Sequence, residues 1–203
     1  MAQMIKTIIV GSGNQDKAAE IKEIFGNRGV AIKDLRDFDG IPSIVEDRNT
    51  LEGNALKKAT ELFKIIRLPI ISDDTGLEVD ALHGEPGVYS ARYAGEDATY
   101  DDNVQKLLQE LKTVPSEQRT ARFRTVTVFY DSEREIVTEG SVEGLITMEP
   151  RGTNGFGYDP VFEVLETGQT FAEMSASAKN ILSHRSRALQ KLFLELQSQK
   201  VLP

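Results

Sequence analysis

The chain has 203 residues with ordinary hydrophobic (39%) and charged (28%) contents, which suits a soluble globular protein with one sizeable domain or two small lobes that share a core. Its 32 acidic and 24 basic residues give a net charge of −8, which argues against a nucleic-acid polymer as partner but leaves room for a nucleotide. The absence of Cys excludes disulfides, zinc–thiolate sites and a Cys nucleophile. Without a signal-peptide pattern or an apolar run approaching roughly 18 residues, the sequence predicts a cytoplasmic protein with no membrane partner.

The first elements predicted are a strand, a turn and a helix. Residues 7–10 are β-branched and predict a buried strand, which the Gly/Ser/Asn turn at residues 11–14 ends. Apolar residues at helical spacing follow over 18–25, and Lys17 lies in the first helical turn. A helix N-terminus after such a turn can bind an anion, although an ordinary strand-to-helix turn explains the same residues equally well.

The next segment predicts a short strand, an acidic loop and a helix. Residues 30–32 predict the strand, and residues 36–50 are polar and irregular. Residues 51–66 show clear 3.6-residue periodicity, with Thr50 as N-cap, and therefore predict a helix.

Two adjacent carboxylates follow a short apolar strand. Ile70 and Ile71 predict the strand, and Asp73 and Asp74 stand where it should end. Neighbouring strand residues point to opposite faces, so one Asp can face a cleft while the other holds the backbone. Such a carboxylate can bind Mg²⁺, although an acidic turn is the alternative. Residues 77–81 alternate apolar and acidic residues and predict a second strand.

The middle of the chain predicts a mixed sheet. Residues 99–114 have helical spacing, and residues 121–130 predict a strand that is apolar on both faces near its end and hence central. Residues 135–138 and 141–146 predict a further strand pair. Strands that interleave with helices, together with adjacent strands at 121–147, predict an α/β fold with a mixed, twisted sheet flanked by helices.

The last part contains a glycine-rich loop and a helix. The loop, residues 152–160, allows close backbone approach, and Phe156 and Tyr158 offer stacking surfaces for a base; a glycine-rich hairpin loop is the alternative. Residues 174–196 predict a helix with a break near Ser183. Lys179 and Arg185 lie near its start, where a surface charge cluster is the alternative.

Together these motifs resemble the inosine triphosphate pyrophosphatase family. The matching stretches are S-G-N-x-x-K at 12–17, T-L-E-G-N-A at 50–55, D-D-T-G-L at 73–77, P-G-V-Y-S-A-R-Y at 86–93, G-F-G-Y-D-P at 155–160 and K-x-x-x-S-H-R at 179–185. The resemblance extends from Ser12 to Arg185, and the combination of motifs is highly specific. It implies two lobes around a central cleft, a single pyrophosphatase domain over residues 1–203, and a homodimer. It also implies Mg²⁺-dependent hydrolysis of ITP, dITP and XTP to the monophosphate and pyrophosphate, which removes deaminated purines from the nucleotide pool.

The resemblance also implies roles for individual residues. Asp74 matches the proton acceptor and, with Glu46, the Mg²⁺ ligands, and Asp47 is the alternative to Glu46. Lys17, Lys179 and the N–H groups near Ser12 would bind the phosphates. His184 and Arg185 would meet the base, where an Arg donor suits the purine O6 and opposes the 6-amino group of adenine. The full set of expected substrate-binding residues is Ser12, Gly13, Asn14, Gln15, Asp16, Lys17, Thr75, Phe156, Gly157, Tyr158, Asp159, Lys179, His184 and Arg185.

Two other functions remain as alternatives. A catalytically silent nucleotide-binding regulator would keep the phosphate loop but lose the carboxylates, and the carboxylates are present. A pyrophosphatase of related fold could act on modified pyrimidine nucleotides, but the S-H-R and G-F-G-Y-D motifs favour purines.

Overall fold

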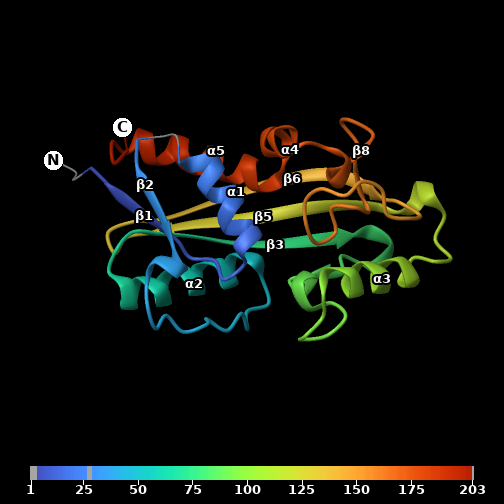
Figure 1. Cartoon of the computed structure of the whole chain (residues 1–203), viewed down its shortest axis with the longest axis horizontal. Helices are drawn as coiled ribbons and strands as arrows, with labels where there is room; N and C mark the ends of the chain where they lie inside the picture. The colour runs from blue at the N-terminus through green and yellow to red at the C-terminus, as the bar shows by residue number, and fades with distance from the viewer. Residues whose placement is uncertain (1–3, 27–28, 203) are drawn as a thin grey trace. The chain divides into compact units, whose positions relative to one another are not determined.

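The computed structural model describes residues 4–26 and 29–202, and Figure 1 shows the path of the chain. These residues form eight strands: β1 (Thr7–Val10), β2 (Ala31–Asp34), β3 (Ile70–Val79), β4 (Pro86–Gly87), β5 (Thr120–Tyr130), β6 (Glu135–Ile146), β7 (Phe162–Val164) and β8 (Gln169–Thr170). They also form five α-helices: α1 (Gln15–Phe25), α2 (Leu51–Ile66), α3 (Tyr100–Glu110), α4 (Ala176–Leu182) and α5 (His184–Ser198).

The described strands belong to one mixed sheet. Its order is β2-β1-β3-β5-β6-β7-β8, and β4 pairs with β3. β1 runs parallel to β2 and to β3, whereas β7 runs antiparallel to β6 and to β8. The predicted mixed α/β class is therefore confirmed, and β5 is central, as its apolar pattern predicts.

Side-chain caps explain where α1 and α2 begin. The Asn14 side chain accepts hydrogen bonds from the backbone N–H groups of Asp16 at 2.9 Å and Lys17 at 3.1 Å. The Thr50 hydroxyl accepts one from the N–H of Gly53 at 3.0 Å. The predicted helix over 51–66 is confirmed with those bounds, and so is its N-cap.

The strand that carries Asp73 and Asp74 differs from the prediction. The strand is expected to end at Asp73 and Asp74, but Ile70–Val79 is one continuous strand. Asp and Gly favour turns, yet cationic side chains and the Asn54 amide contact both carboxylates, so extended backbone continues through them. Gly76 permits the close approach of β4, because a Cβ there would lie 2.7 Å from the Gly87 carbonyl oxygen.

The predicted strand pair at 135–146 is also a single strand, β6. Gly144 does not interrupt it, because the missing side chain makes room for the neighbouring strand. A Cβ at Gly144 would lie 2.5 Å from both the Phe162 ring and the Glu163 carbonyl oxygen. Farther along the chain, α3 ends at Glu110, four residues before the predicted 114, whereas the break near Ser183 between α4 and α5 is confirmed.

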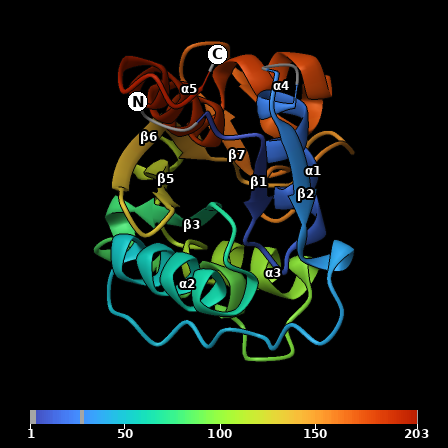
Figure 2. The ribbon, with the colours of Figure 1, turned by 90° about the vertical axis from the view of Figure 1, so that its left-hand side faces the viewer.

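The chain folds as two compact units. Unit 1 contains the chain up to Asp74, Thr125–Gly140 and the chain from Arg185 onward; unit 2 contains Thr75–Arg124 and Ser141–His184. In unit 1, helices cover both faces of the strands, and Figure 2 shows α2 on one side and α5 on the other. Ile8 and Val10 pack with α1 and α5, whereas Ile9 packs with α2. This alternation follows from the two-residue period of a strand.

Unit 2 has its own core, in which three aromatic rings are central. The Phe123 and Phe162 ring centroids are 4.7 Å apart, and those of Phe162 and Phe171 are 5.5 Å apart. α3 contributes Leu107 to this core, and Leu182 of α4 packs against it.

Candidate functional site

The two adjacent carboxylates of β3 have partners on opposite faces of the strand. The Asp73 Oδ2 atom accepts a hydrogen bond from Arg185 Nε of α5 at 3.1 Å. The Asp74 Oδ2 atom accepts one from Asn54 Nδ2 of α2 at 3.0 Å. Both carboxylates are buried, at 0% and 4% exposure. Because their partners come from different helices, α5 and α2, the predicted alternation of faces is confirmed, although it occurs within a strand and not at its end.

Two lysines and a third acid complete this cluster in unit 1. Lys17 Nζ lies 3.6 Å from Asp73 Oδ2 and 4.0 Å from Asp74 Oδ1. Lys58 Nζ lies 3.9 Å from Asp74 Oδ1 and 2.8 Å from Glu46 Oε1. We call these five residues, Lys17, Glu46, Lys58, Asp73 and Asp74, the carboxylate site.

The site moves the pKa values of its two neighbouring aspartates in opposite directions. Burial alone would raise the pKa of Asp73, but the positive charges of Lys17, Arg185 and Lys58 outweigh it and hold that pKa well below its usual range. Burial raises the pKa of Asp74, and Lys17 and Lys58 offset this only in part. Carboxylates separated in this way can take different roles: Asp73 stays ionised, whereas Asp74 is the better proton acceptor.

The donor set of the carboxylate site fits a magnesium ion. Glu46 and Asp74 both approach the Lys58 ammonium, so a cationic centre is already shared by two hard oxygen donors. Mg²⁺ typically uses one or two carboxylates together with substrate phosphates and water. Within residues 4–26 and 29–202, no three His, Cys, Asp or Glu side chains form a metal-binding group, so oxygens beyond the protein would have to complete the coordination.

The loop geometry distinguishes Glu46 from its neighbour. Asp47 Oδ1 accepts a hydrogen bond from Lys57 Nζ at 2.9 Å, and its side chain is 55% exposed. Glu46 instead pairs with the buried Lys58 beside Asp74. Of the two acids between which the alignment leaves a choice, Glu46 is therefore the one that accompanies Asp74.

The expected phosphate loop lies in unit 1 before α1. Gly13 is exposed, and a Cβ there would meet nothing within 4 Å, so a ligand can approach this backbone. Asn14 has a structural role as N-cap, and its amide oxygen engages the N–H groups of Asp16 and Lys17. The Ser12 hydroxyl accepts a hydrogen bond from the Asn14 N–H at 3.2 Å. Gln15 is exposed, like Asp16, at the start of the helix. Contacts of this loop with phosphate remain a prediction.

Arg185, which the resemblance assigns to the base, has carboxylate partners in the structure. Its side chain is 1% exposed and pairs with Asp73 and with Glu20 of α1. Two carboxylates thus engage its guanidinium within unit 1. This geometry favours a role in holding Asp73 ionised over a role at the base.

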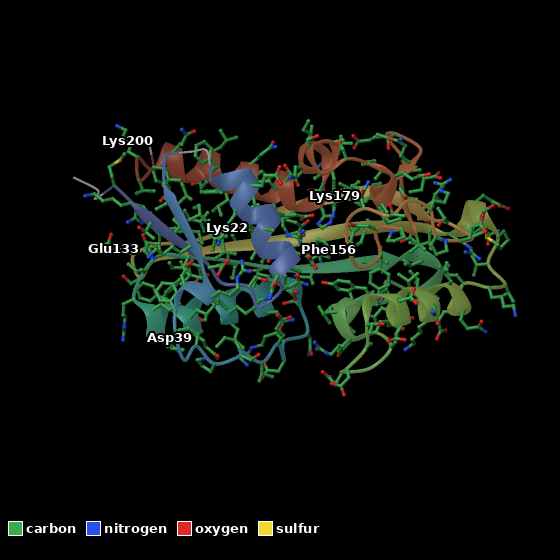
Figure 3. All side chains as sticks on the ribbon, in the orientation of Figure 1. Lys22, Asp39, Glu133, Phe156, Lys179 and Lys200 are labelled. Carbon is green, nitrogen blue, oxygen red and sulfur yellow. The ribbon has the colours of Figure 1, made fainter. Side chains whose placement is uncertain are left out.

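A second cluster lies in unit 2, in the glycine-rich loop and α4. Lys179 Nζ donates to Asp159 Oδ2 at 2.6 Å, and both residues are buried. The same ammonium lies 4.5 Å from the centre of the Phe156 ring, and Figure 3 labels both residues. Asp159 also accepts a hydrogen bond from the Phe156 N–H at 2.8 Å. We call Phe156, Asp159 and Lys179 the loop site. Lys179 therefore accompanies the residues expected at the base, whereas a phosphate role was predicted for it.

Gly155 makes the loop site sterically feasible. It has φ +74°, and a Cβ there would lie 2.0 Å from Asp159 Oδ2. Gly157 also has a positive φ, of +63°, and has open space around it. Any side chain at position 155 would force the Asp159 carboxylate away from Lys179.

Two aromatic residues expected at the base are largely buried in unit 2. Tyr158 is 5% exposed, and its hydroxyl donates to the Ser90 carbonyl at 2.9 Å, so it does not offer an open stacking face. Burial raises the pKa of Tyr158 well above its usual range, so the hydroxyl stays protonated. The His184 ring stacks on Phe123 with centroids 4.7 Å apart and is 3% exposed. Thr75 is half-buried directly after Asp74 on β3.

Sequence reasoning missed Lys58 of the carboxylate site and Asn54, which donates a hydrogen bond to Asp74 of that site. They stand four residues apart on α2, beside the apolar residues Ala55 and Ala59. Both are buried, at 6% and 0% exposure, although Lys and Asn are normally exposed. Two polar residues at i and i+4 beside a helix's apolar stripe were the available signal.

None of the described helices combines the length and hydropathy that a membrane crossing would need.

Comparison with known proteins agrees with these motifs. The model of the Ham1 family matches residues 8–195. The chain is 49% identical to the dITP/XTP pyrophosphatase of Bacillus licheniformis over 189 residues, 93% of this chain and 96% of that protein. It is 48% identical to the dITP/XTP pyrophosphatase of Shouchella clausii over 186 residues, 91% and 93% of the two chains.

Solved structures agree as well. The Ham1 protein of Coxiella burnetii is similar with a TM-score of 0.86 and 37% identity, covering 96% of this chain and 100% of that one. The Ham1 protein of Staphylococcus aureus gives a TM-score of 0.85 and 36% identity over the same shares.

Proposed function

The chain belongs to the Ham1 family, and from this we propose that it hydrolyses ITP, dITP and XTP to the nucleoside monophosphate and pyrophosphate. Its relatives named dITP/XTP pyrophosphatase support this substrate class, and removal of such nucleotides keeps deaminated purines out of DNA and RNA. The observation that carries the proposal is the pair Asp73 and Asp74, with opposite pKa shifts beside two buried or half-buried lysines. A catalytically silent binding protein would have no need for such a pair.

We assign the carboxylate site to the triphosphate. Asp74 and Glu46 would hold Mg²⁺, which when bound would neutralise negative charge on the phosphates. Lys17 would bind phosphate together with the backbone near Gly13. Lys58 would add positive charge next to the reacting group, and its ammonium lies 2.8 Å from Glu46 and 3.9 Å from Asp74, the two proposed metal ligands.

Hydrolysis requires a base for water and compensation of charge at the phosphate. A water molecule attacks phosphorus, the α–β anhydride bond breaks, and pyrophosphate leaves. Asp74 accepts the proton of the attacking water, for which its raised pKa is suited. Asp73 remains ionised between Arg185 and Lys17 and so holds the Lys17 ammonium in position. Fixed charges of this kind stabilise developing negative charge with little reorganisation.

We assign the loop site to the purine base. A 6-oxopurine presents a donor at N1–H next to an acceptor at O6. The loop site offers the complement, because the Asp159 carboxylate accepts and the Lys179 ammonium donates. Adenine presents the reverse pattern and would leave both charged groups unsatisfied. Guanine has the same edge as hypoxanthine, so its rejection requires a further feature at the 2-amino group.

Other aspects of the proposal rest on the resemblance and on the family. We propose that both units act in one pyrophosphatase domain over residues 1–203, that the protein forms a homodimer, and that it works in the cytoplasm. Ser12, Gln15, Asp16, Thr75, Gly157 and His184 stay proposed substrate contacts, whereas Asn14 and Tyr158 are proposed to support the two loops.

A panel of triphosphates tests the proposal. Pyrophosphate release is measured with Mg²⁺ for ITP, dITP, XTP, GTP, ATP and a modified pyrimidine triphosphate. We expect kcat/KM to be highest for the 6-oxopurines that lack a 2-amino group. Asp159→Asn should narrow the ITP/ATP ratio by roughly 5- to 150-fold, the cost of about 1–3 kcal/mol for a mismatched polar group.

A matched variant in the other cluster separates base recognition from phosphate binding. Lys17→Met should weaken all triphosphates together and leave the ITP/ATP ratio unchanged. A preference for modified pyrimidines, or an unchanged ratio in Asp159→Asn, would refute the assignment of the loop site to a purine.

A further inference from the structure

Tyr100 lies beside the loop site, although no motif identified in the sequence includes it. It is the first residue of α3, and its side chain remains 43% exposed. The centre of its ring is 5.9 Å from that of Phe156, with an angle of 39° between the rings. This distance lies within the range of interacting aromatic pairs.

The backbone of Tyr100 is held in place on both sides. Thr99 and Asp102 form a reciprocal capping box, with hydrogen bonds of 3.1 Å from Asp102 N–H to Thr99 Oγ1 and 2.9 Å from Thr99 N–H to Asp102 Oδ2. Asn103 Nδ2 donates to the Ala91 carbonyl at 3.1 Å, and Asn103 Oδ1 accepts from the Ala94 N–H at 2.8 Å. The position from which the Tyr100 ring projects is thus fixed by four hydrogen bonds.

Phe156 is held in place by other residues, which lie later in the sequence than α3. Asp159 accepts the hydrogen bond of its backbone N–H, and the Lys179 ammonium lies over its ring. Two aromatic rings from separate elements are therefore brought together next to the Asp159–Lys179 pair. Phe156 is half-buried, so Tyr100 supplies the more accessible ring of the two.

We propose that Tyr100 is a second stacking surface for the purine, next to Phe156. This inference rests on the proposed function, which puts the base at the loop site. A π-face contacts the purine ring system and not its substituents, so stacking supports every purine to a similar degree. Tyr100 would therefore contribute affinity without discrimination, whereas Asp159 and Lys179 would discriminate without needing a large contact area.

Simple packing explains Tyr100 less well than ligand contact does. The residues through which α3 joins the core of unit 2, Val104 and Leu107, are buried, whereas Tyr100 is not. Single exposed aromatics are common on protein surfaces, so exposure alone carries no weight. The contact with Phe156 makes the difference. Tyr89 shows the contrast: it is 53% exposed in the same unit, but its partner is the Arg92 guanidinium, 5.3 Å from its ring.

Kinetics of four variants test the inference. Tyr100→Ala and Tyr100→Leu should raise KM for both ITP and ATP about five- to tenfold, the effect of losing one modest stacking contact, and should leave kcat and the ITP/ATP ratio unchanged. Tyr100→Phe should retain the KM of the parent protein. Tyr89→Ala is the matched control and should change nothing. Leu keeps apolar contact with Phe156 but has no π-face, so a Tyr100→Leu variant with the parental KM would reduce Tyr100 to a packing residue and overturn the inference.

Fluorescence gives a readout that a packing role would not produce. The chain has no Trp and five Tyr, so its intrinsic emission comes from tyrosine. Titration with IMP should quench this emission in the parent protein and in Tyr89→Phe, and the quenching should be largely lost in Tyr100→Phe. Retained quenching in Tyr100→Phe would overturn the inference.

Phe156→Ala distinguishes the two levels of the proposal. If it raises KM while Tyr100→Ala does not, the base lies at the loop site and the role of Tyr100 is refuted. If neither variant changes KM, the proposed base site itself fails, and the inference fails with it. Circular dichroism of each variant verifies that the fold is intact.

Discussion

Arg185 Nε of α5 donates to Asp73 Oδ2 of β3 at 3.1 Å, and both side chains are almost completely withdrawn from solvent. The two residues are 112 positions apart in the sequence, so this ion pair joins α5 to the strand that carries the proposed catalytic carboxylate, Asp74. Arg185 also pairs with Glu20, which extends the connection to α1. The arginine of the S-H-R motif is thus part of the support of the carboxylate site.

Replacement of Arg185 should lower stability and leave substrate preference unchanged. Arg185→Met removes one partner of a buried pair and leaves Asp73 and Glu20 less compensated, a change that costs about 3–5 kcal/mol. The denaturant concentration at the midpoint of unfolding should therefore fall, and kcat/KM should fall for ITP and ATP alike. Lys191→Ala on the exposed face of the same helix is the control, since Lys191 donates to the Glu139 backbone carbonyl. If Arg185→Met narrows the ratio of kcat/KM for ITP to that for ATP, Arg185 takes part in recognition of the base.

Asp74→Asn should abolish most activity while preserving the fold. The substitution keeps the size of the side chain and the neighbour Asn54 but removes the proton acceptor and one proposed metal ligand. We expect turnover to fall roughly 100-fold or more, as for loss of a general base. Pyrophosphate release with ITP measures the effect, and Asp39→Asn, an exposed acid in unit 1, is the control. Near-parental turnover in the folded Asp74→Asn protein would show that another group accepts the proton.

Glu46 and Asp47 should respond differently to magnesium. Glu46→Gln should raise the Mg²⁺ concentration needed for half-maximal activity, because Glu46 shares the Lys58 ammonium with Asp74. Asp47→Asn should change it little, because Asp47 is half-exposed and pairs with Lys57. A magnesium titration of both variants measures this difference. If Asp47→Asn raises the required Mg²⁺ concentration more than Glu46→Gln does, the proposed metal ligand is Asp47 and not Glu46.

Asp34 should make the stability of unit 1 depend on acid pH. The Arg36 guanidinium, followed by the Lys22 ammonium, outweighs the effect of burial and holds the pKa of Asp34 well below its usual range. A lowered pKa in the folded state stabilises above the unfolded value, about 3.9, and this stabilisation is lost as the pH falls further. Asp34→Asn should therefore lower Tm at pH 7, and the Tm difference should shrink below about pH 4. Thermal melts from pH 3 to pH 7 measure it; a difference independent of pH would mean that the charge of Asp34 does not stabilise the fold.

The sequence predicts the individual elements well because the signals for them are local. The helix over 51–66 follows from periodicity and from Thr50, and the opposite faces of Asp73 and Asp74 follow from the two-residue period of a strand. Local signals failed where distant partners decide the conformation. The turn-forming residues after Ile71 stay in one strand because side chains of α1, α2 and α5 contact both carboxylates.

The sequence indicates which residue types belong to the candidate site, but it does not indicate which side chains contact each other there. The motifs identify Lys179 and Arg185, but their spacing does not tell which carboxylate each will meet. In the structure these are Asp159 for Lys179, and Asp73 with Glu20 for Arg185. No motif identified Lys58, because its contact with Asp74 depends on the packing of α2 next to β3.

Gly155 has a consequence for laboratory evolution of substrate range. The Asp159 carboxylate occupies the volume in which any other residue at 155 would place its Cβ. In the proposed site, base preference thus depends on a residue with no functional group of its own. Libraries that randomise only the polar residues around the base would retain this constraint. Diversity at position 155, with compensating changes at 159, gives access to variants that accept both adenine and hypoxanthine nucleotides, and such generalists should emerge without any change in the carboxylate site.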